Sequence, residues 1–265
     1  MSTVTTTTLS AEMKTFYDMR LIDEASPMLV HEQFGQKRPI PQGGGKTVNF
    51  RRFSPLAKAT TALTEGVTPS GSSLSVSSIS AIVAQYGDYV VQSDVLELTA
   101  VDNTILETTK LLGRQAGLTM DTIVRNALLL GTNKSYAPKY VADTNGNLVE
   151  TEVTKTADLD TSAKLTVDVV QRVVAKLRAQ NAPTIGGDYV CIIHPYVAYD
   201  LMRDPEWIDA HKYATPENLY TGEIGKMAGV RFVQSTEAKI DKGGSDNPSG
   251  LAVFHCLFIG DGAYG

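Results

Sequence analysis

The sequence has few of the features that mark secreted or membrane-spanning proteins. It contains only two cysteines, Cys191 and Cys256, each within an apolar run. This predicts two buried thiols in a reducing compartment, with one disulfide bridge as the alternative. Residues 1–10 are rich in threonine and lack the basic and apolar regions of a signal peptide. No stretch approaches the roughly 18 consecutive apolar residues of a membrane span, so we expect a protein that stays in a cytoplasm until lysis releases it.

An excess of positive charge is also absent. The chain has 24 Lys and Arg against 29 Asp and Glu, which gives a formal net charge of −5. This is the wrong sign for tight binding of nucleic acid through its phosphates, and it leaves only weak contact with DNA through a local patch. Hydrophobic residues make up 42% of the 265 residues, which is enough for one large globular domain or two modest ones.

The motifs that would indicate an enzyme are incomplete. Residues 43–47 (GGGKT) partly match a phosphate-binding loop, but Ile40 stands where the motif needs its first glycine, and a strand pattern follows where a helix is needed. We interpret these glycines as a flexible hinge. No G-x-S-x-G elbow for a serine nucleophile occurs, and residues 143–146 (DTNG) lack the later ligands of a calcium loop.

Four metal-ligating side chains occur on two apolar segments that could be neighbours: Cys191, His194, His255 and Cys256. A zinc site is one interpretation of this set. His255 and Cys256 are consecutive, however, so on a strand their side chains face opposite sides. Because free cysteine is usually buried as a small hydrophobe, we favour core packing. The sequence therefore predicts no catalytic, cofactor-binding or metal-binding residues, no cofactor, and a protein that is not an enzyme.

The N-terminal third of the chain predicts extensions rather than a compact domain. Residues 1–42 show helical periodicity only around 12–23 and end in a proline-containing extended segment, so we expect an arm that needs a partner surface. Strand patterns at 46–53 and 74–86 enclose a long polar connection. Because so long a loop is uncommon inside a compact domain, we expect this hairpin to project as an arm. It carries basic side chains that are either solvated or paired with a neighbouring subunit: Arg51, Arg52 and Lys58.

A long helix and a mixed set of shorter elements follow. Asp94 and Glu97 resemble a capping box that opens a helix reaching Gly131. Such a helix is about 50 Å long, and Gly113 and Gly117 favour a bend within it. The later patterns predict a tight turn at Asn145-Gly146, a helix from Thr166 to near Asn181, a strand over 188–193, a helix over 195–202, a strand over 230–233 and an unbroken strand over 251–259.

Several segments carry a more specific signal. Residues 217–233 contain the pattern G-x-I-G-x-x-x-G-V-R, His194-Pro195 follows a helix and a strand, and Ile259-Gly260 precedes Ala263-Tyr264-Gly265. In this order, and with the arm, hairpin and long helix, they resemble the tailed-phage major capsid proteins of the podovirus type, whose fold encapsulins share. The resemblance implies an α+β capsid fold. Its expected parts are an N-terminal arm (1–42), an extended hairpin loop (43–92), a peripheral domain holding a spine helix (93–160), an axial domain (161–240) and a strand that returns to the peripheral domain (241–265).

The resemblance also implies a function. A major capsid protein assembles into hexamers and pentamers of an icosahedral shell around double-stranded DNA, and its loop and arm reach neighbouring capsomers. The implied partners are further copies of the chain, a separate scaffolding protein, portal and decoration proteins, and packaged DNA held weakly, with assembly in the host cytoplasm and no membrane. An encapsulin-like compartment shell or another virion protein is the alternative, and a cytosolic enzyme would need a polar pocket. The sequence ends at Gly265, where related chains continue, so we expect either a shortened chain or a peripheral sheet that closes differently.

Overall fold

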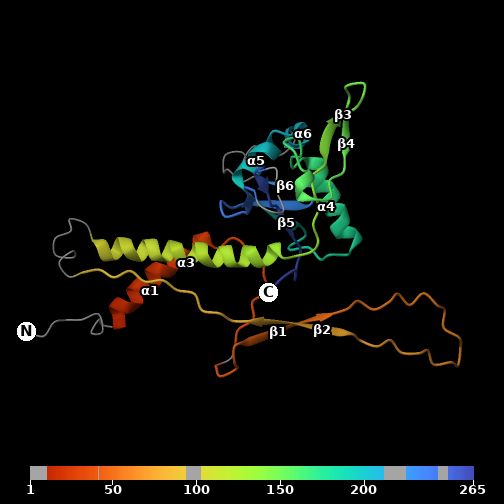
Figure 1. The fold of residues 1–265 in the computed structure, drawn as a ribbon. Coiled ribbons are helices and arrows are strands. Elements are labelled where there is room, and N and C mark those ends of the chain that lie inside the picture. The colour runs from red at the N-terminus through yellow and green to blue at the C-terminus, as the bar shows by residue number, and fades with distance from the viewer. Residues whose placement is uncertain (1–10, 41, 94–102, 212–224, 244–249) are drawn as a thin grey trace, which may run out of the picture. The chain divides into compact units, whose positions relative to one another are not determined.

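The computed structural model describes residues 11–40, 42–93, 103–211, 225–243 and 250–265. The chain divides into two compact units, Met1–Gly35 with Tyr89–Tyr264, and Gln36–Asp88 with Gly265. Figure 1 shows the helices and sheets of the larger unit and the hairpin of the smaller one. No helix within the described residues is long and apolar enough to span a membrane.

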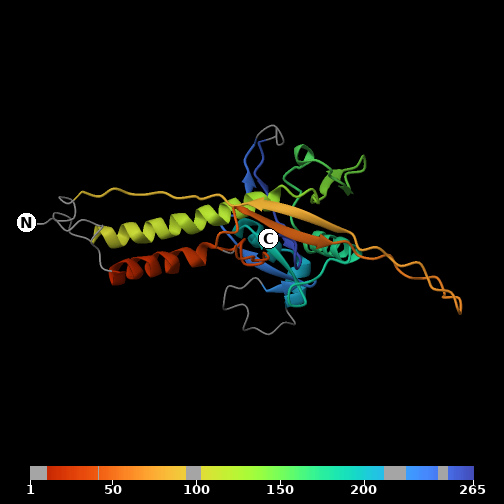
Figure 2. The ribbon, with the colours of Figure 1, turned by 90° about the horizontal axis from the view of Figure 1, so that it is seen from below.

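The larger unit contains two long helices that run side by side in both views (Figures 1 and 2), α1 (Ala11–Ala25) and α3 (Thr104–Leu129). A Cβ atom added at Gly113 would lie 2.8 Å from the carbonyl oxygen of Leu21. One added at Gly117 would lie 2.6 Å from the carbonyl oxygen of Ala25. The two glycines therefore allow the backbones of α1 and α3 to approach closely, and α3 is continuous through both of them where the sequence predicted a bend.

The spine helix α3 begins later than the sequence predicted. Asn103 caps it, because its side-chain oxygen accepts a hydrogen bond from the backbone N–H of Leu106 at 3.2 Å and its own backbone is not helical. The predicted capping pair, Asp94 and Glu97, lies outside the described residues. With 26 residues, α3 is about 39 Å long rather than about 50 Å.

A four-stranded mixed sheet forms the centre of the larger unit. Its strand order is β10-β5-β7-β6, in which β5 and β7 are parallel and the other pairs are antiparallel. The strands are β5 (Tyr189–Ile193), β6 (Lys226–Met227), β7 (Val230–Gln234) and β10 (Leu257–Ile259). All five residues of β5 are buried, as its unbroken apolar sequence predicts for a strand covered on both faces.

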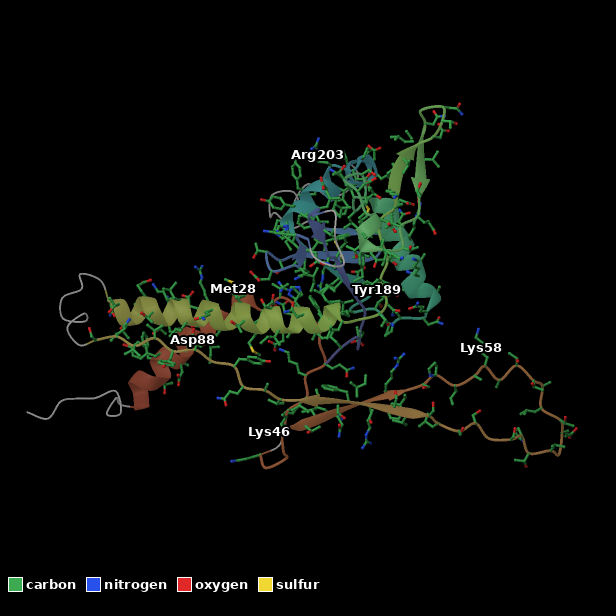
Figure 3. The ribbon with its side chains drawn as sticks, viewed as in Figure 1. Met28, Lys46, Lys58, Asp88, Tyr189 and Arg203 are labelled. Carbon is green, nitrogen blue, oxygen red and sulfur yellow. The ribbon has the colours of Figure 1, made fainter. Side chains whose placement is uncertain are left out.

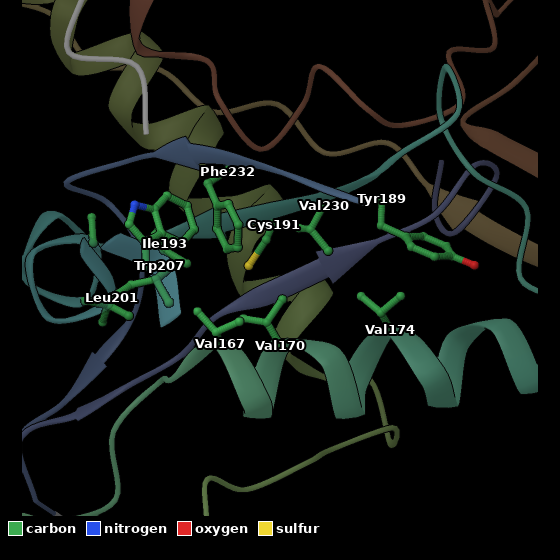
Figure 4. Close-up of a cluster of buried hydrophobic side chains, with 12 residues drawn as sticks. Val167, Val170, Val174, Tyr189, Cys191, Ile193, Leu201, Trp207, Val230 and Phe232 are labelled. Carbon is green, nitrogen blue, oxygen red and sulfur yellow. The ribbon is translucent and has the colours of Figure 1, made fainter. Parts of the chain in front are cut away.

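Helices cover one face of β5 and β7: α4 (Val167–Ala179), α5 (Pro195–Met202) and α6 (Pro205–His211). In Figure 4, Val170 and Val174 stand on the side of α4 that faces Cys191 and Val230 of the sheet. This confirms the amphipathic helix predicted from the sequence. Burial of each such side chain stabilises the fold by about 1.5–3 kcal/mol, so the cluster defines the main core.

The opposite face of β5 is covered by residues far away in the sequence. Val190 and Ile192 pack there against Val30 and Phe34, which follow α1, and against Tyr264. The sequence predicted that the N-terminal segment would need a partner surface. For its described part up to residue 35, α3 and this sheet supply that surface within the same chain.

The hairpin between α3 and α4 forms as predicted, with β3 (Lys139–Ala142) and β4 (Leu148–Thr151) paired antiparallel. The Asp143 carboxylate accepts hydrogen bonds from the backbone N–H groups of Asn145 at 2.7 Å and Asn147 at 3.0 Å. Gly146 has a φ of +80°. The acidic residue that faintly resembled a calcium ligand therefore stabilises the turn. Short 3₁₀ turns, η2 (Ser26–Met28) and η3 (Thr156–Asp158), occur elsewhere in the unit.

The prediction of one unbroken strand over residues 251–259 is wrong. The segment forms two short strands, β9 (Val253–Phe254), which pairs with β8 (Ile240–Asp241), and β10, which pairs with β5. At the break, the His255 N–H donates to the carbonyl oxygen of Lys239 at 3.0 Å, and His255 Nε2 lies 2.7 Å from Asp241 Oδ2. These polar contacts hold the point at which the chain changes its partner strand.

The smaller unit contains the predicted hairpin, β1 (Thr47–Phe53) and β2 (Val76–Ile82). The second strand is shorter than the predicted 74–86. Residues 54–75 connect the two strands without further regular secondary structure, as the polar composition of the connection indicated.

Candidate assembly surface

The hairpin of the smaller unit is the strongest candidate for an interaction site. β1 and β2 pair antiparallel over their whole length, from Thr47 opposite Ile82 to Phe53 opposite Val76. Residues directly opposite each other share a face, and successive pairs alternate between the two faces. We define the open face as the one that carries Thr47, Asn49, Arg51, Phe53, Val76, Ser78, Ser80 and Ile82.

The open face is apolar at both ends and uncovered. Phe53, Val76 and Ile82 are 58%, 50% and 77% exposed. On the other face, Phe50 is half-buried, and a Cβ atom added at Gly265 would lie 2.6 Å from its ring, while Ile79 opposite Phe50 is 63% exposed. A two-stranded hairpin is at best marginally stable by itself in water, and several large exposed apolar side chains on one such element indicate an interaction surface. The open face is therefore suited to contact a further surface.

The connection between the strands adds to this surface. All of residues 54–75 are exposed, and Lys58 extends away from the ribbon (Figure 3). Ordering such a segment costs about 1–2 kcal/mol per residue in backbone entropy. The connection also exposes large apolar side chains: Leu56, Leu63, Val67 and Leu74. Contacts with another molecule would offset the cost of ordering it.

The smaller unit also has the opposite charge from the rest of the chain. Gln36–Asp88 contains six Lys or Arg and two Asp or Glu, a net charge of +4. Since the whole chain carries −5, the remaining residues carry −9. Opposite charge on two parts of one chain favours head-to-tail association between copies, because complementary potentials steer encounter and orientation.

The glycine-rich segment at the start of the hairpin does not form a phosphate-binding loop. Gly43 and Gly45 each have a φ of +82°, which favours glycine over any other residue. Thr47 begins β1, so the loop leads into a strand and not into the helix that a phosphate-binding loop requires. The glycines form the turn before the hairpin, and their role as a hinge stays a prediction.

The larger unit contains a buried polar cluster that sequence reasoning missed. His31 and Asp121 are both fully buried, and His31 Nδ1 lies 2.7 Å from Asp121 Oδ2. Asp121 Oδ1 also accepts hydrogen bonds from the backbone N–H groups of Val30 at 2.8 Å and His31 at 2.7 Å. The hydroxyl of Tyr264 donates to the carbonyl oxygen of His31. One carboxylate on α3 thus holds a segment 90 residues away in the sequence.

The surroundings of Asp121 favour its ionised form. Burial by itself raises the pKa of Asp121, but the hydrogen bonds from His31 and Val30 outweigh it, so the pKa lies below its ordinary 3.8. Burial raises the pKa of Tyr264 to about 12. His31 Nε2 is buried and has no hydrogen-bond partner in the part of the chain that the structure describes. One feature of the sequence could have indicated that Asp121 is buried. It follows Gly117 by four residues and therefore lies on the same face of α3.

The side chains considered as zinc ligands have structural roles. His194 Nδ1 accepts a hydrogen bond from the backbone N–H of Tyr196 at 3.2 Å and so caps α5. His255 pairs with Asp241, as described above. Burial raises the pKa of Cys191 and raises that of Cys256 to about 12, which disfavours the reactive thiolate form of both. Among the described residues, no group of three or more His, Cys, Asp or Glu is arranged to hold a metal ion.

The glycine-patterned motif lies partly outside the described residues, which resume at Gly225. Its remaining part forms the antiparallel β6–β7 hairpin. Ala228 and Gly229 occupy the turn with φ values of +54° and +79°. Two successive residues with positive φ are typical of a type I′ hairpin turn, which explains why the second of them is glycine.

Comparisons with known proteins agree with this fold. A family model described as phage capsid protein matches residues 10–253. The capsid of Ralstonia phage GP4 has a TM-score of 0.60 at 19% identity, covering 83% of this chain and 69% of that chain. The capsid of the cyanophage P-SCSP1u has a TM-score of 0.60 at 15% identity, covering 88% and 72%. Mycobacterium phage Che8 has a TM-score of 0.52 at 14% identity, covering 79% and 69%. No curated protein matches in sequence.

Proposed function

Because this chain belongs to the phage capsid protein family and is a major capsid protein of the virion, we propose that its copies form hexamers and pentamers of an icosahedral shell around double-stranded DNA. The exposed hairpin carries this proposal. Its apolar residues Phe53, Val76 and Ile82 are uncovered in a single chain, and a shell presents a neighbouring copy to each hairpin. Since the family is structural, we propose that the chain has no catalytic activity.

The proposed roles of the segments follow the division expected from the sequence. Residues 1–42 act as an arm that packs on its own subunit in its described part up to residue 35 and also contacts neighbouring subunits, and residues 43–92 act as an extended loop that reaches them. Residues 93–160, with α3, form a peripheral domain. Residues 161–240 form an axial domain at the capsomer centre. Residues 241–265 form the return segment toward the peripheral domain, and β10 within them also joins the central sheet beside β5. The placement of α4, α5 and α6 on the central sheet supports an axial domain with its own core.

Further partners belong to the same proposal. We propose a separate scaffolding protein, portal and decoration proteins, and assembly in the host cytoplasm. The net charge of −5 supports weak contact with packaged DNA, because an acidic lining does not hold phosphates tightly. The family match is to phage capsid proteins, and no observation favours the encapsulin-like compartment that the sequence left as an alternative.

The assembly itself is testable with the purified chain, alone and co-expressed with the scaffolding protein. We expect rings and closed particles in negative-stain images and fast-sedimenting species in the ultracentrifuge. A small monodisperse species under all of these conditions would contradict the proposal.

Removal of residues 57–73 is expected to abolish closed shells without unfolding the larger unit, because these residues are exposed and make up most of the connection between β1 and β2. Circular dichroism should show the helical content retained, and negative-stain images should show no closed particles. A second variant keeps the full length of the connection but replaces Leu63 and Val67 by serine. It shows whether assembly depends on the length of the connection or on its apolar contacts. Normal shells from the deletion variant would exclude the proposed role of the hairpin.

A further inference from the structure

Tyr264 connects the C-terminal end of the larger unit to the segment that follows α1 (Figures 1 and 2). Its hydroxyl donates a hydrogen bond to the carbonyl oxygen of His31. Its side chain packs on the same buried cluster of the central sheet as Val30 and Phe34. A Cβ atom added at Gly35 would lie 2.7 Å from one ring carbon of Tyr264 and 3.1 Å from a second. One side chain therefore holds the segment from His31 to Gly35.

This ring also explains why residue 35 is glycine. Gly35 does not have a positive φ, so its backbone conformation is open to other residues. A Cβ atom at this position would instead press on the Tyr264 ring. The ring is anchored at its other end by the hydrogen bond to His31. Because burial raises the pKa of Tyr264 to about 12, the hydroxyl stays protonated and able to donate.

The contact lies where the chain passes from one unit to the other. Such passages occur at residues 35–36, 88–89 and 264–265. Gly35 and Tyr264 are the residues of the larger unit at two of these three passages, and they lie against each other. One side chain thus ties together two of the three connections that lead to the smaller unit. Tying two segments together at their ends lowers the conformational freedom of the chain beyond them.

The Asp121 cluster does not replace this contact. Asp121 holds the backbone N–H groups of Val30 and His31, at the start of the segment. Further along, the guanidinium of Arg231 lies 5.8 Å from the centre of the Phe34 ring. At Gly35, the three atoms nearest to an added Cβ all belong to Tyr264. The end of the segment therefore depends on Tyr264.

We propose that Tyr264 is a clasp that fixes the base of the smaller unit and so limits the orientations that its hairpin can take. This inference rests on the proposed function, because a chain that enters both hexamers and pentamers must present its hairpin at more than one angle. With the clasp closed, residues 30–35 stay on the sheet, and adjustment on this connection is confined to residues 36–45, which include Gly43 and Gly45. With the clasp open, residues 32–35 also leave the sheet, and the hairpin loses its fixed base.

Hydrogen exchange of the unassembled full-length chain tests the clasp without a shell. Tyr264→Ala is expected to speed the exchange of the backbone amides of residues 32–35 about tenfold or more, which corresponds to about 1.4 kcal/mol of easier local opening. The amides of α4 should not change. Tyr264→Phe keeps the ring and loses the hydroxyl, so its effect should be smaller. Equal acceleration throughout the larger unit, or none at residues 32–35, would overturn the clasp.

The matched control is the same truncation at Tyr196, whose side chain is 69% exposed on α5. Tyr196→Ala should leave the exchange of residues 32–35 unchanged, because α5 covers the opposite face of β5 from this segment. Acceleration as large as in Tyr264→Ala would mean that loss of any tyrosine loosens the segment, which would also overturn the clasp.

A double-mutant cycle tests the contact between Tyr264 and Gly35. Gly35→Ala in the unchanged chain pushes on the ring and should speed the exchange of residues 32–35 severalfold. In the Tyr264→Ala chain the same change meets no ring, so it should have little further effect. Equal effects of Gly35→Ala in the two chains would show that Tyr264 does not hold Gly35.

Negative-stain images of assembled protein test the role of the clasp in the shell. Tyr264→Ala should give a broader distribution of particle diameters and more open particles than the unchanged chain, and Tyr264→Phe should lie close to the unchanged chain. Uniform closed particles from Tyr264→Ala would overturn this role. If the unchanged chain forms no particles under any condition, the proposed function fails, and the exchange measurements still decide whether Tyr264 holds the segment.

Discussion

Replacement of Asp121 by alanine is expected to destabilise the larger unit by about 3–5 kcal/mol, because each buried donor left without an acceptor costs about 1–3 kcal/mol. The change leaves three buried donors without an acceptor, namely the backbone N–H groups of Val30 and His31 and the imidazole of His31. It also releases the segment that covers one face of β5. Urea unfolding followed by circular dichroism, at fixed protein concentration, measures the loss.

Two further variants separate the charge from the hydrogen bonds. Asp121→Asn keeps an oxygen that can accept from the two backbone N–H groups but loses the charge opposite His31, so its effect should be intermediate. Glu152→Ala removes an exposed carboxylate and should change the free energy of unfolding by less than about 0.5 kcal/mol. A loss in Asp121→Ala no larger than in Glu152→Ala would show that the buried cluster contributes nothing to stability.

The same contribution should depend on pH in one direction. Because the pKa of Asp121 in the folded chain lies below its ordinary 3.8, the ionised carboxylate stabilises the fold above that pH. The contribution is lost as the pH falls through the lower folded-state value. The difference in free energy of unfolding between the unchanged chain and Asp121→Ala should therefore be large near neutral pH and shrink below pH 3.8. A difference that grows on acidification would contradict this account.

Replacement of Gly117 by alanine is expected to destabilise the chain by about 2 kcal/mol, although alanine favours helix by about 1 kcal/mol over glycine. The added Cβ atom would lie 2.6 Å from the carbonyl oxygen of Ala25 and 3.0 Å from the Cβ of Met28. Backbone atoms cannot move aside as a flexible side chain can, so α1 must shift away from α3. Thermal and urea unfolding measure the net effect.

The matched control for this variant is Ala116→Leu. It adds more volume one residue away on α3, at an exposed position, and should be nearly neutral. If Gly117→Ala instead stabilises the chain by about its helix-propensity gain, the helices are not in close contact at that point.

Several elements were predictable because their signals are local. The Thr166 cap and the valines that follow it specify α4, and the apolar run YVCII specifies β5. The Asn145-Gly146 turn specifies the β3–β4 hairpin. The start of α3 was predicted too early, because the spacing of Asp94 and Glu97 matches a capping box. In the structure the capping residue of α3 is Asn103.

The hairpin from β1 to β2 was visible in the sequence by itself, as two alternating strands around a polar connection too long for a compact domain. The order of these local patterns also indicated the capsid family, which the family match confirmed. Only the tertiary structure showed what Gly117 and Asp121 contact and where the strand before Ile259 breaks. Each of these depends on contacts between residues far apart in the chain, and local propensity and periodicity carry no information about such contacts.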